Sequence, residues 1–467
     1  MTQAFPNIVL VVMDTARWDR FGCYGSTRGA TPTVDSLARE GRTVETMVSN
    51  GPWTLPSHGS LFTGLYPSEH GSQWGTGPRL RNDVKITMAE WFKSLGYRTV
   101  CATSNSLISN ETGLARGFDE YVTKRTLRAG PGRKLRRARN LAVGGDSGGR
   151  VVNRWLKERL DGTQDPLFLF VNYLECHWPY SPPQRVVRRV KGPKFGPVEG
   201  LRYRLGTVRK TGPWEAIRAA DPRTLERLST LYDAELWNAD RHLADLLDLL
   251  RDAGRLRDGE TIVIVTSDHG EHIGEHGLAD HQASVDDHLV RVPFVLWGPE
   301  RIPAGSRLGM YEFVDVLPSL GELLGAEIPV PYLERRRTGL FSDGEMRDGD
   351  GLAFGEWRSW SEEEMLRLSS KNASYDFSAL RRDLVFVRDE RFKLVRAGGR
   401  SERLFDLEAD PMEEIDVAPD HPEVVRRLRQ ELDRAIDSWK SWGDGAEDLT
   451  PQEAEEIEEH LSALGYI

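Results

Sequence analysis

A threonine near the start of segment 50–66 is the first residue that could carry out chemistry. Thr54 precedes a predicted short helix, in which Pro56 suits the first turn and Gly64 suits the end. The entrance of a helix presents unpaired backbone N–H groups and the positive end of the helix dipole. This position suits an anion, or a hydroxyl group that becomes one during a reaction. Taken alone, the simpler interpretation is that Thr54 caps the helix.

Three further residues could hold a divalent metal ion beside this hydroxyl. Asp14, Asp268 and His269 offer two carboxylates and an imidazole, and a deprotonated Thr54 would be the fourth ligand. A metal is one way to activate a hydroxyl, because its ordinary pKa is too high for attack at neutral pH. Imidazole favours Mn or Zn over the hard cations Ca and Mg. Each residue alone would be assigned a structural role, but together they predict a metal site.

The elements that must position these residues are buried strands. Continuous apolar runs, typical of a parallel sheet covered on both faces, occur at 8–13, 97–102, 167–171, 261–265 and 292–297. Asp14, Asp268 with His269, and Glu175 with His177 each follow such a run. Because ligands gather beyond the carboxyl ends of parallel strands, we expect these side chains to meet at one edge of the sheet.

Helical patterns lie between the apolar runs. A capping box at 87–90 opens a helix that Gly96 closes, and leucines at helical spacing predict a long helix over about 223–251. Alternating strands and helices predict an α/β fold, a mostly parallel sheet sandwiched by helices. We expect this catalytic domain to span residues 1–345.

After about residue 345 the pattern changes to closely spaced short strands. These strands are predicted at 352–357, 384–388, 392–396 and 404–407. Helices are predicted at about 423–439 and again from 450. We therefore expect a small C-terminal α+β subdomain over 346–467, with an antiparallel sheet.

Two basic segments interrupt the catalytic domain, near 124–160 and 185–211. Clustered Lys and Arg could form a nucleic-acid-binding patch. No aromatic interleaving or known binding module accompanies the charge, so nucleic acid is not the expected partner and we interpret both segments as solvated surface inserts. An intermediate possibility is a positive rim that steers an anionic substrate.

Composition limits the class of protein. The chain has 467 residues, 29% of them charged, and a formal net charge of −10. Its three cysteines are too few for a disulfide framework. We find no signal-peptide pattern and no apolar run near the roughly 20 residues that span a bilayer. A cytoplasmic protein without a membrane partner is expected, and the oligomeric state is not predicted.

Five stretches, in order, resemble the sulfatase family, a branch of the alkaline phosphatase superfamily. The stretch TLPSHGSLFTGLYP, which begins at Thr54, resembles the nucleophile segment of that family. The others are NIVLVVMD at 7–14 with GCYG at 22–25, ECHWPY at 175–180, SDHGE at 267–271 with GEHG at 274–277, and LFDLEADP at 404–411. The resemblance implies an alkaline phosphatase-like fold and a small anionic ester as substrate.

The resemblance also implies roles for single residues. Asp14 matches the first acidic metal ligand of the family, and Asp268 with His269 matches the late pair. His177 matches a histidine near the leaving group, which it could protonate. His281 lies where relatives place a histidine or lysine that contacts substrate, so both histidines are expected to be catalytic.

Two more histidines in the same stretch have weaker assignments. His272 and His276 are expected to contact and orient the metal ligands without binding the metal themselves. Because four histidines fall within fourteen residues, a second metal is the alternative interpretation.

Departures from the family pattern bear on the reaction. Sulfatases carry Cys or Ser where this chain has Thr54, and that residue is converted to formylglycine, a conversion not known for threonine. A threonine phosphate can be hydrolysed by water, whereas a threonine sulfate requires a second attack at sulfur. His58 replaces an arginine, Thr15 replaces an acidic residue, and 104–108 replaces a Gly-Lys-Trp-His segment. His58 and Asn105 are expected to contact substrate instead.

The sequence thus predicts a metal-dependent hydrolase of phosphomonoesters, phosphodiesters or phosphonates with a threonine nucleophile. A sulfuric ester hydrolase is the alternative. A phosphoryl transferase and a non-catalytic relative that binds polyanions are further alternatives.

Overall fold

The computed structural model describes most of the chain, and all structural statements below concern the described part. The described residues are 5–73, 78–127, 145–160, 165–196, 198–200, 203, 220–256, 259–298, 300–330, 333, 336–342, 351–361, 365, 381–399, 401–440, 455–457, 459 and 461.

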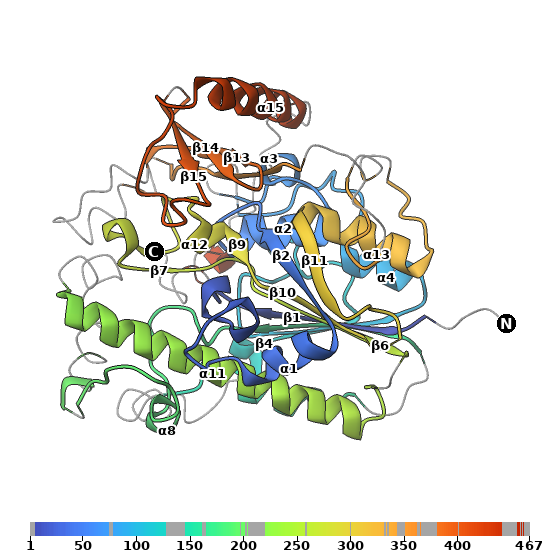
Figure 1. The fold of residues 1–467 in the computed structure, drawn as a ribbon. Coiled ribbons are helices and arrows are strands. Elements are labelled where there is room, and N and C mark those ends of the chain that lie inside the picture. The colour runs from blue at the N-terminus through green and yellow to red at the C-terminus, as the bar shows by residue number, and fades with distance from the viewer. Residues whose placement is uncertain are drawn as a thin grey trace.

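A nine-stranded sheet forms the centre of the molecule (Figure 1). Strand β1 (Asn7–Met13) lies in its middle and pairs in parallel with β5 (Leu167–Tyr173) and β6 (Thr261–Thr266). The strand order is β11-β2-β10-β6-β1-β5-β3-β4, with β9 paired to β2. The remaining strands are β2 (Arg42–Val48), β3 (Arg98–Thr103), β4 (Glu120–Thr123), β9 (Arg291–Val292), β10 (Phe294–Trp297) and β11 (Gly305–Glu312).

The apolar run at 292–297 does not form the parallel strand that was predicted. Pro293 separates β9 from β10, and β10 runs antiparallel to both β6 and β2. Phe294 lies opposite Thr266, so the chain between them leaves and re-enters the sheet at the same edge. Because no long crossover carries the chain to the opposite edge, β10 must run the other way. An apolar run indicates burial on both faces, not strand direction.

Helices cover both faces of the sheet (Figure 1). One face carries α1 (Pro32–Glu40), α7 (Gly149–Lys157), α8 (Gln184–Val187) and the long α11 (Pro222–Asp252). The other carries α2 (Thr54–Thr63), α4 (Met88–Ser94) and α13 (Val316–Leu324). Along β1, Ile8, Leu10 and Val12 join the core on the α2 side, and the alternate residues join the core on the α11 side. Both faces of the sheet are buried, which explains the uninterrupted apolar sequence.

Parts of the basic segments are packed, which differs from the solvated inserts that were expected. Helix α7 buries Val152 and Leu156, and α8 buries Val186 and Val187, in the core that α11 shares. In α7 these apolar residues recur at helical spacing between the basic ones, so this helix has one apolar face. Residues 128–144 and 204–219 lie outside the described part of the chain.

A second, four-stranded antiparallel sheet follows, as predicted. It contains β12 (Ala353–Trp357), β13 (Leu384–Arg388), β14 (Phe392–Ala397) and β15 (Ser401–Asp406), in that order. Helix α15 (Pro422–Lys440) packs on it through a core that includes Leu394, Leu404 and Leu428 (Figure 1). The helix predicted from 450 falls largely outside the described residues. Among the described helices, none has the length and apolarity that a membrane span requires.

A buried lysine joins this second sheet to the catalytic part of the chain. Lys393, on β14, is fully buried and donates hydrogen bonds to Val285 O at 2.6 Å, Asp287 Oδ1 at 3.0 Å and Glu413 Oε1 at 3.1 Å. Arg388 forms an ion pair with the same Asp287. The contact therefore depends on balanced buried charges.

Replacing Lys393 with Met is expected to destabilise the protein by about 3–5 kcal/mol, because Asp287 and Glu413 lose a buried positive partner. Urea unfolding followed by tryptophan fluorescence measures this change. Lys157→Met, at an exposed position on α7, is the control and should stay within about 0.5 kcal/mol of the parent. Equal stability of the two variants would contradict the assigned role of the buried lysine.

Candidate active site

The predicted metal ligands meet at the carboxyl ends of the two central strands. Asp14 directly follows β1, and Asp268 and His269 follow β6 after a single serine. One ligand atom from each of the three side chains lies within 4.8 Å of the others, and all three side chains are fully buried. Because β1 and β6 are parallel neighbours, residues more than 250 positions apart in the chain lie side by side.

The hydrogen bonds of these side chains leave one atom of each directed at a common point. Asn172 and Asn105 donate to Asp14 Oδ2, Thr15 N donates to Asp268 Oδ1, and His269 Nδ1 donates to Gly270 O. The opposite atoms, Asp14 Oδ1, Asp268 Oδ2 and His269 Nε2, are buried and have no hydrogen-bond partner among the described residues. Buried polar atoms without partners are costly, so this arrangement fits a divalent cation. Two carboxylates and the lone pair of an imidazole are suitable ligands.

The charges at this point lead to the same conclusion. Burial raises the pKa of Asp14, and the neighbouring Asp268 carboxylate raises it further. Two buried carboxylates therefore repel each other until a positive charge joins them. A bound cation would remove this repulsion.

Thr54 is the first residue of α2 and lies beside the same cluster. Trp53, not Thr54, occupies the N-cap position of this helix, so the interpretation of Thr54 as a simple helix cap is wrong. Its Oγ1 accepts a hydrogen bond of 3.1 Å from Asn105 Nδ2, which also donates 2.8 Å to Asp14 Oδ2. One amide group thus joins the threonine hydroxyl to a predicted metal ligand. Gly64 ends the helix with φ of 70°, as predicted.

The two residues predicted to contact substrate lie next to these groups. Asn105 follows β3, and its amide makes the two contacts just described. His58 lies one turn after Thr54 on α2, where its Nδ1 donates to Thr54 O at 2.9 Å and lies 3.6 Å from Asp268 Oδ2. The observed contacts of His58 are therefore with the helix and a metal ligand, and its substrate contact stays a prediction.

The two histidines predicted to be catalytic lie together although 104 positions separate them. The rings of His177 and His281 have centroids 5.1 Å apart, and the His281 ring lies 4.4 Å from that of His269. Burial lowers the pKa of His281 to about 4, which keeps its imidazole neutral near pH 7. His177 Nδ1 donates to Trp178 O at 2.7 Å, which fixes the orientation of the ring.

The other two histidines of the same stretch lie apart from this cluster. His272 Nε2 is 3.3 Å and His276 Nε2 is 3.6 Å from one oxygen of Asp286. Within the described chain, the four histidines form two separate pairs, with ring centroids 4.4 Å apart for His269 and His281 and 6.2 Å apart for His272 and His276, so the four do not form a single metal site.

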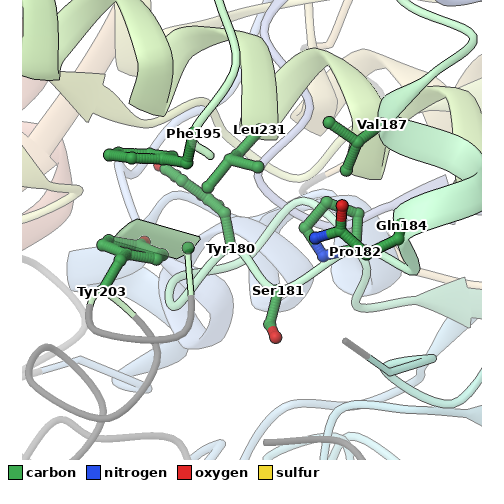
Figure 2. A pocket seen from close by; sticks show the side chains of 9 residues that line it. Tyr180, Ser181, Pro182, Gln184, Val187, Phe195, Tyr203 and Leu231 are labelled. Atoms are coloured by element: carbon green, nitrogen blue, oxygen red, sulfur yellow. The ribbon is translucent and has the colours of Figure 1, made fainter. Parts of the chain in front are cut away.

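Aromatic packing supports the segment that carries His177 (Figure 2). Tyr180 lines a small pocket together with Phe195, Tyr203 and Leu231 of α11. The rings of Phe195 and Tyr203 are stacked with centroids 5.3 Å apart. This packing anchors the turn that follows His177 against the long helix.

Asn172, whose contribution was not predicted, also belongs to the site. It is a fully buried amide inside the otherwise apolar β5 and donates 3.0 Å to Asp14 Oδ2. Its polarity within an apolar run was the only signal in the sequence, because a buried amide needs a specific partner.

Asn105→Ala is expected to reduce kcat/KM by about 10–100-fold, because both Thr54 Oγ1 and Asp14 Oδ2 lose the donor that orients them. Steady-state kinetics on the best substrate and metal content together measure this effect. Ser106→Ala, at the next position along the chain, is the control and should leave kcat/KM nearly unchanged. A loss below twofold for the asparagine variant would show that the amide has no positioning role.

The fold and the cluster define the class of protein. A sheet sandwiched by helices, with a hydroxyl at a helix entrance and a carboxylate–imidazole cluster at the strand ends, is the architecture of alkaline phosphatase-like enzymes. The chain belongs to the sulfatase family of that superfamily: the family model described as Sulfatase matches residues 6–326. It is a hydrolase of this superfamily, which acts on sulfate or phosphate esters.

Three similar proteins illustrate the range of the family. An arylsulfatase of Clostridium perfringens is 24% identical over 384 residues, which cover 69% of this chain and 76% of that protein. The structure of a 2-O GAG sulfatase matches with a TM-score of 0.70 and 17% identity over 93% of both chains. The phosphonate monoester hydrolase of Agrobacterium radiobacter matches with a TM-score of 0.66 and 22% identity over 93% of this chain and 95% of that one. At these identities the structural matches establish the fold alone.

Proposed function

We propose that the protein is a metal-dependent hydrolase of phosphorus esters, namely phosphomonoesters, phosphodiesters or phosphonates, with Thr54 as nucleophile. The observation that carries the proposal is the placement of Thr54 Oγ1, which one asparagine amide joins to the Asp14–Asp268–His269 cluster. Each side chain of this cluster has one buried atom without a hydrogen-bond partner among the described residues. A threonine cannot be expected to become formylglycine, so its own hydroxyl must act. This chemistry suits phosphorus, because water can hydrolyse the resulting threonine phosphate.

The residues present fit a bound divalent cation. Asp14, Asp268 and His269 would hold it with Thr54 as fourth ligand, and the imidazole favours Mn or Zn over Ca or Mg. Such a cation would lower the pKa of a coordinated hydroxyl and offset negative charge on the substrate.

The other steps belong to residues of the chain. Thr54 Oγ1 forms a bond to phosphorus while the bond to the leaving oxygen breaks, and Asn105 holds Oγ1 in place. His177 donates a proton to the departing oxygen. Water then gives a proton to His177 and forms a bond to phosphorus while the bond to Oγ1 breaks. This step restores the threonine and releases phosphate, a phosphomonoester or phosphonate, according to the substrate. The neutral His281 is placed to contact the substrate or to transfer a proton.

Hydrolysis of sulfuric esters is the second candidate, and the comparisons favour it. Two of the three proteins described above are sulfatases, and one acts on a glycosaminoglycan according to its name. By analogy, a sulfated sugar is a suitable substrate class. With Thr54 unmodified, this reaction requires water to attack the sulfur of a threonine sulfate.

A substrate panel distinguishes the two candidates. The p-nitrophenyl esters of phosphate, phenylphosphonate and sulfate, with bis-p-nitrophenyl phosphate, are offered to metal-stripped protein reloaded with Mn, Zn, Mg or Ca. The proposal expects the highest kcat/KM on a phosphorus ester with Mn or Zn. A higher value on sulfate would establish the second candidate. Absence of any turnover would favour a non-catalytic polyanion-binding relative, whose binding should weaken steeply with salt.

A phosphoryl transferase would share every residue above and differ only in its acceptor. Addition of a small alcohol to the panel tests this alternative. Equal release of nitrophenol and phosphate indicates transfer to water, whereas an excess of nitrophenol indicates transfer to the alcohol.

A further inference from the structure

A second group of metal-ligating side chains lies outside the site described above. Asp146, Glu175 and His242 each place one ligand atom within 4.8 Å of the others. They come from three different parts of the fold: the residues before α7, the end of β5 and the middle of α11. The catalytic cluster contains none of them.

The distances place these groups around one point. His242 Nε2 lies 2.8 Å from Asp146 Oδ2 and 3.5 Å from Glu175 Oε1. Glu175 is fully buried, and His242 has an exposed fraction of only 4%. Asp146 is partly exposed, so the group lies just below the surface. An ion could therefore reach it from solvent without unfolding of the core.

An unsatisfied carboxylate oxygen is independent evidence for a ligand. Glu175 Oε1 accepts a 3.0 Å hydrogen bond from Gly149 N, but Oε2 is buried and has no hydrogen-bond partner among the described residues. A buried carboxylate oxygen without a partner carries a large desolvation penalty. A cation bound between the three side chains would remove this penalty.

A second buried glutamate, Glu235, adds negative charge to the same region. Glu235 lies two turns before His242 on α11 and accepts from Ser181 N at 2.8 Å through Oε1, while its Oε2 is buried and has no partner. Burial raises the pKa of Glu235, and the charge of Glu175 raises it further. Three carboxylates thus share this region with one imidazole and with Lys124, whose charge acts on both glutamates.

We propose that Asp146, Glu175 and His242 bind a second divalent cation, Zn²⁺ or Mn²⁺, at a site separate from the catalytic one. Carboxylates with one imidazole form a common ligand set for these ions.

The location gives this site a structural role. Glu175 lies two residues before His177. Ser181 lies four residues after His177 and donates its backbone N–H to Glu235. A cation here would tie α11 and the start of α7 to both sides of the segment that carries the predicted leaving-group histidine. It would thereby fix the backbone of that segment without contacting substrate.

An ion pair without metal is the competing explanation. In that case a protonated His242 would lie between Asp146 and Glu175, and the hydrogen bond to Asp146 does raise the pKa of His242 against the opposing effect of burial. The two explanations differ in the number of metal ions that the folded protein binds.

Metal stoichiometry tests the proposal without reference to activity. Metal-free protein is dialysed to equilibrium against micromolar Zn²⁺ or Mn²⁺, and bound metal is measured by mass spectrometry, with circular dichroism as the check on folding. Two equivalents are expected for the parent, one each for Asp146→Asn and Asp268→Ala, and none for the double variant. Asp245→Asn, which changes an exposed carboxylate one turn from His242 on α11, is the matched control and should keep two equivalents.

Several outcomes would overturn the proposal. One equivalent in the parent, or two in Asp146→Asn, would favour the ion pair. If Asp146→Asn does not fold, Co²⁺ titration of the Asp268→Ala protein decides: one equivalent with d–d absorption supports the second site, and no binding contradicts it. Because Asp268 is changed in that protein, failure of the proposed catalytic function would not affect the result.

Discussion

Replacing Thr54 with Ala is expected to reduce kcat by about 10⁶-fold, the size of loss seen when a nucleophile is removed from a hydrolase. The hydroxyl would form the bond to phosphorus, and the amide of Asn105, its described hydrogen-bond partner, cannot take over that role. KM is expected to change much less, because the substrate contacts predicted for His58, His177 and His281 remain. Single-turnover kinetics with a p-nitrophenyl ester measures the loss and shows whether a covalent intermediate forms.

The structure offers a sharp control for this variant. Thr54 does not cap α2, and the described contact of its hydroxyl is with Asn105, so removal of the hydroxyl should leave folding intact. Thr54→Ser retains a hydroxyl at the same place and is expected to retain kcat within about tenfold, a change of about 1.4 kcal/mol in the barrier. If the alanine variant kept more than a thousandth of the parent rate, the threonine would not be the nucleophile.

Removal of the metal is expected to cause the next largest effect, a loss of at least about 10³-fold in kcat/KM. Lewis-acid stabilisation is worth several kcal/mol, and each 1.36 kcal/mol corresponds to a factor of ten. Chelation followed by dialysis should abolish turnover, and Mn or Zn should restore it better than Ca or Mg because of the imidazole of His269. Activity and bound metal are measured on the same samples.

Asp268→Ala tests which residues hold this metal. Asp268 Oδ2 is one of the three buried atoms without a partner, while Oδ1 is held by the backbone of Thr15 and His269. The variant should lose the catalytic equivalent and should not regain activity when Mn or Zn is added. Asp248→Ala, an exposed carboxylate on α11, controls for general loss of negative charge. Unchanged metal content in Asp268→Ala would place the catalytic ligands elsewhere.

The proposed second cation changes how metal removal should be interpreted. Chelation of the parent would empty both sites, so slow or incomplete recovery could arise from the segment around His177 rather than from the catalytic cluster. The Asp146→Asn variant separates these effects, because its activity should depend on a single cation.

Much of the architecture was predictable because the local pattern of apolar residues indicates which segments are buried. The apolar runs of β1, β5 and β6 contain no polar face, so a sheet covered on both sides was expected and is observed. The long helix was predicted over 223–251 and spans Pro222–Asp252. The direction of β10 was not predictable, because direction depends on where the connecting chain returns to the sheet.

The residues that form the candidate site were largely predictable from the sequence, whereas the hydrogen bonds between them were not. Asp14, Asp268 and His269 were expected at strand ends, and they converge there. The amide contacts of Asn105 and Asn172 with Asp14, and the position of His58 beside Asp268, were not expected. These contacts depend on side-chain directions at three separate elements, which no short segment specifies.

The sequence by itself determined the types of chemical groups, their burial and the elements that carry them, because these depend on composition and local periodicity. Only the tertiary structure decided which groups meet. The parallel pairing of β1 with β6 joins residues more than 250 positions apart into the catalytic cluster. The packing of α11 against the end of β5 brings His242 to Glu175. A polar group in the interior acts through the partners that packing gives it, and those partners are distant in the sequence.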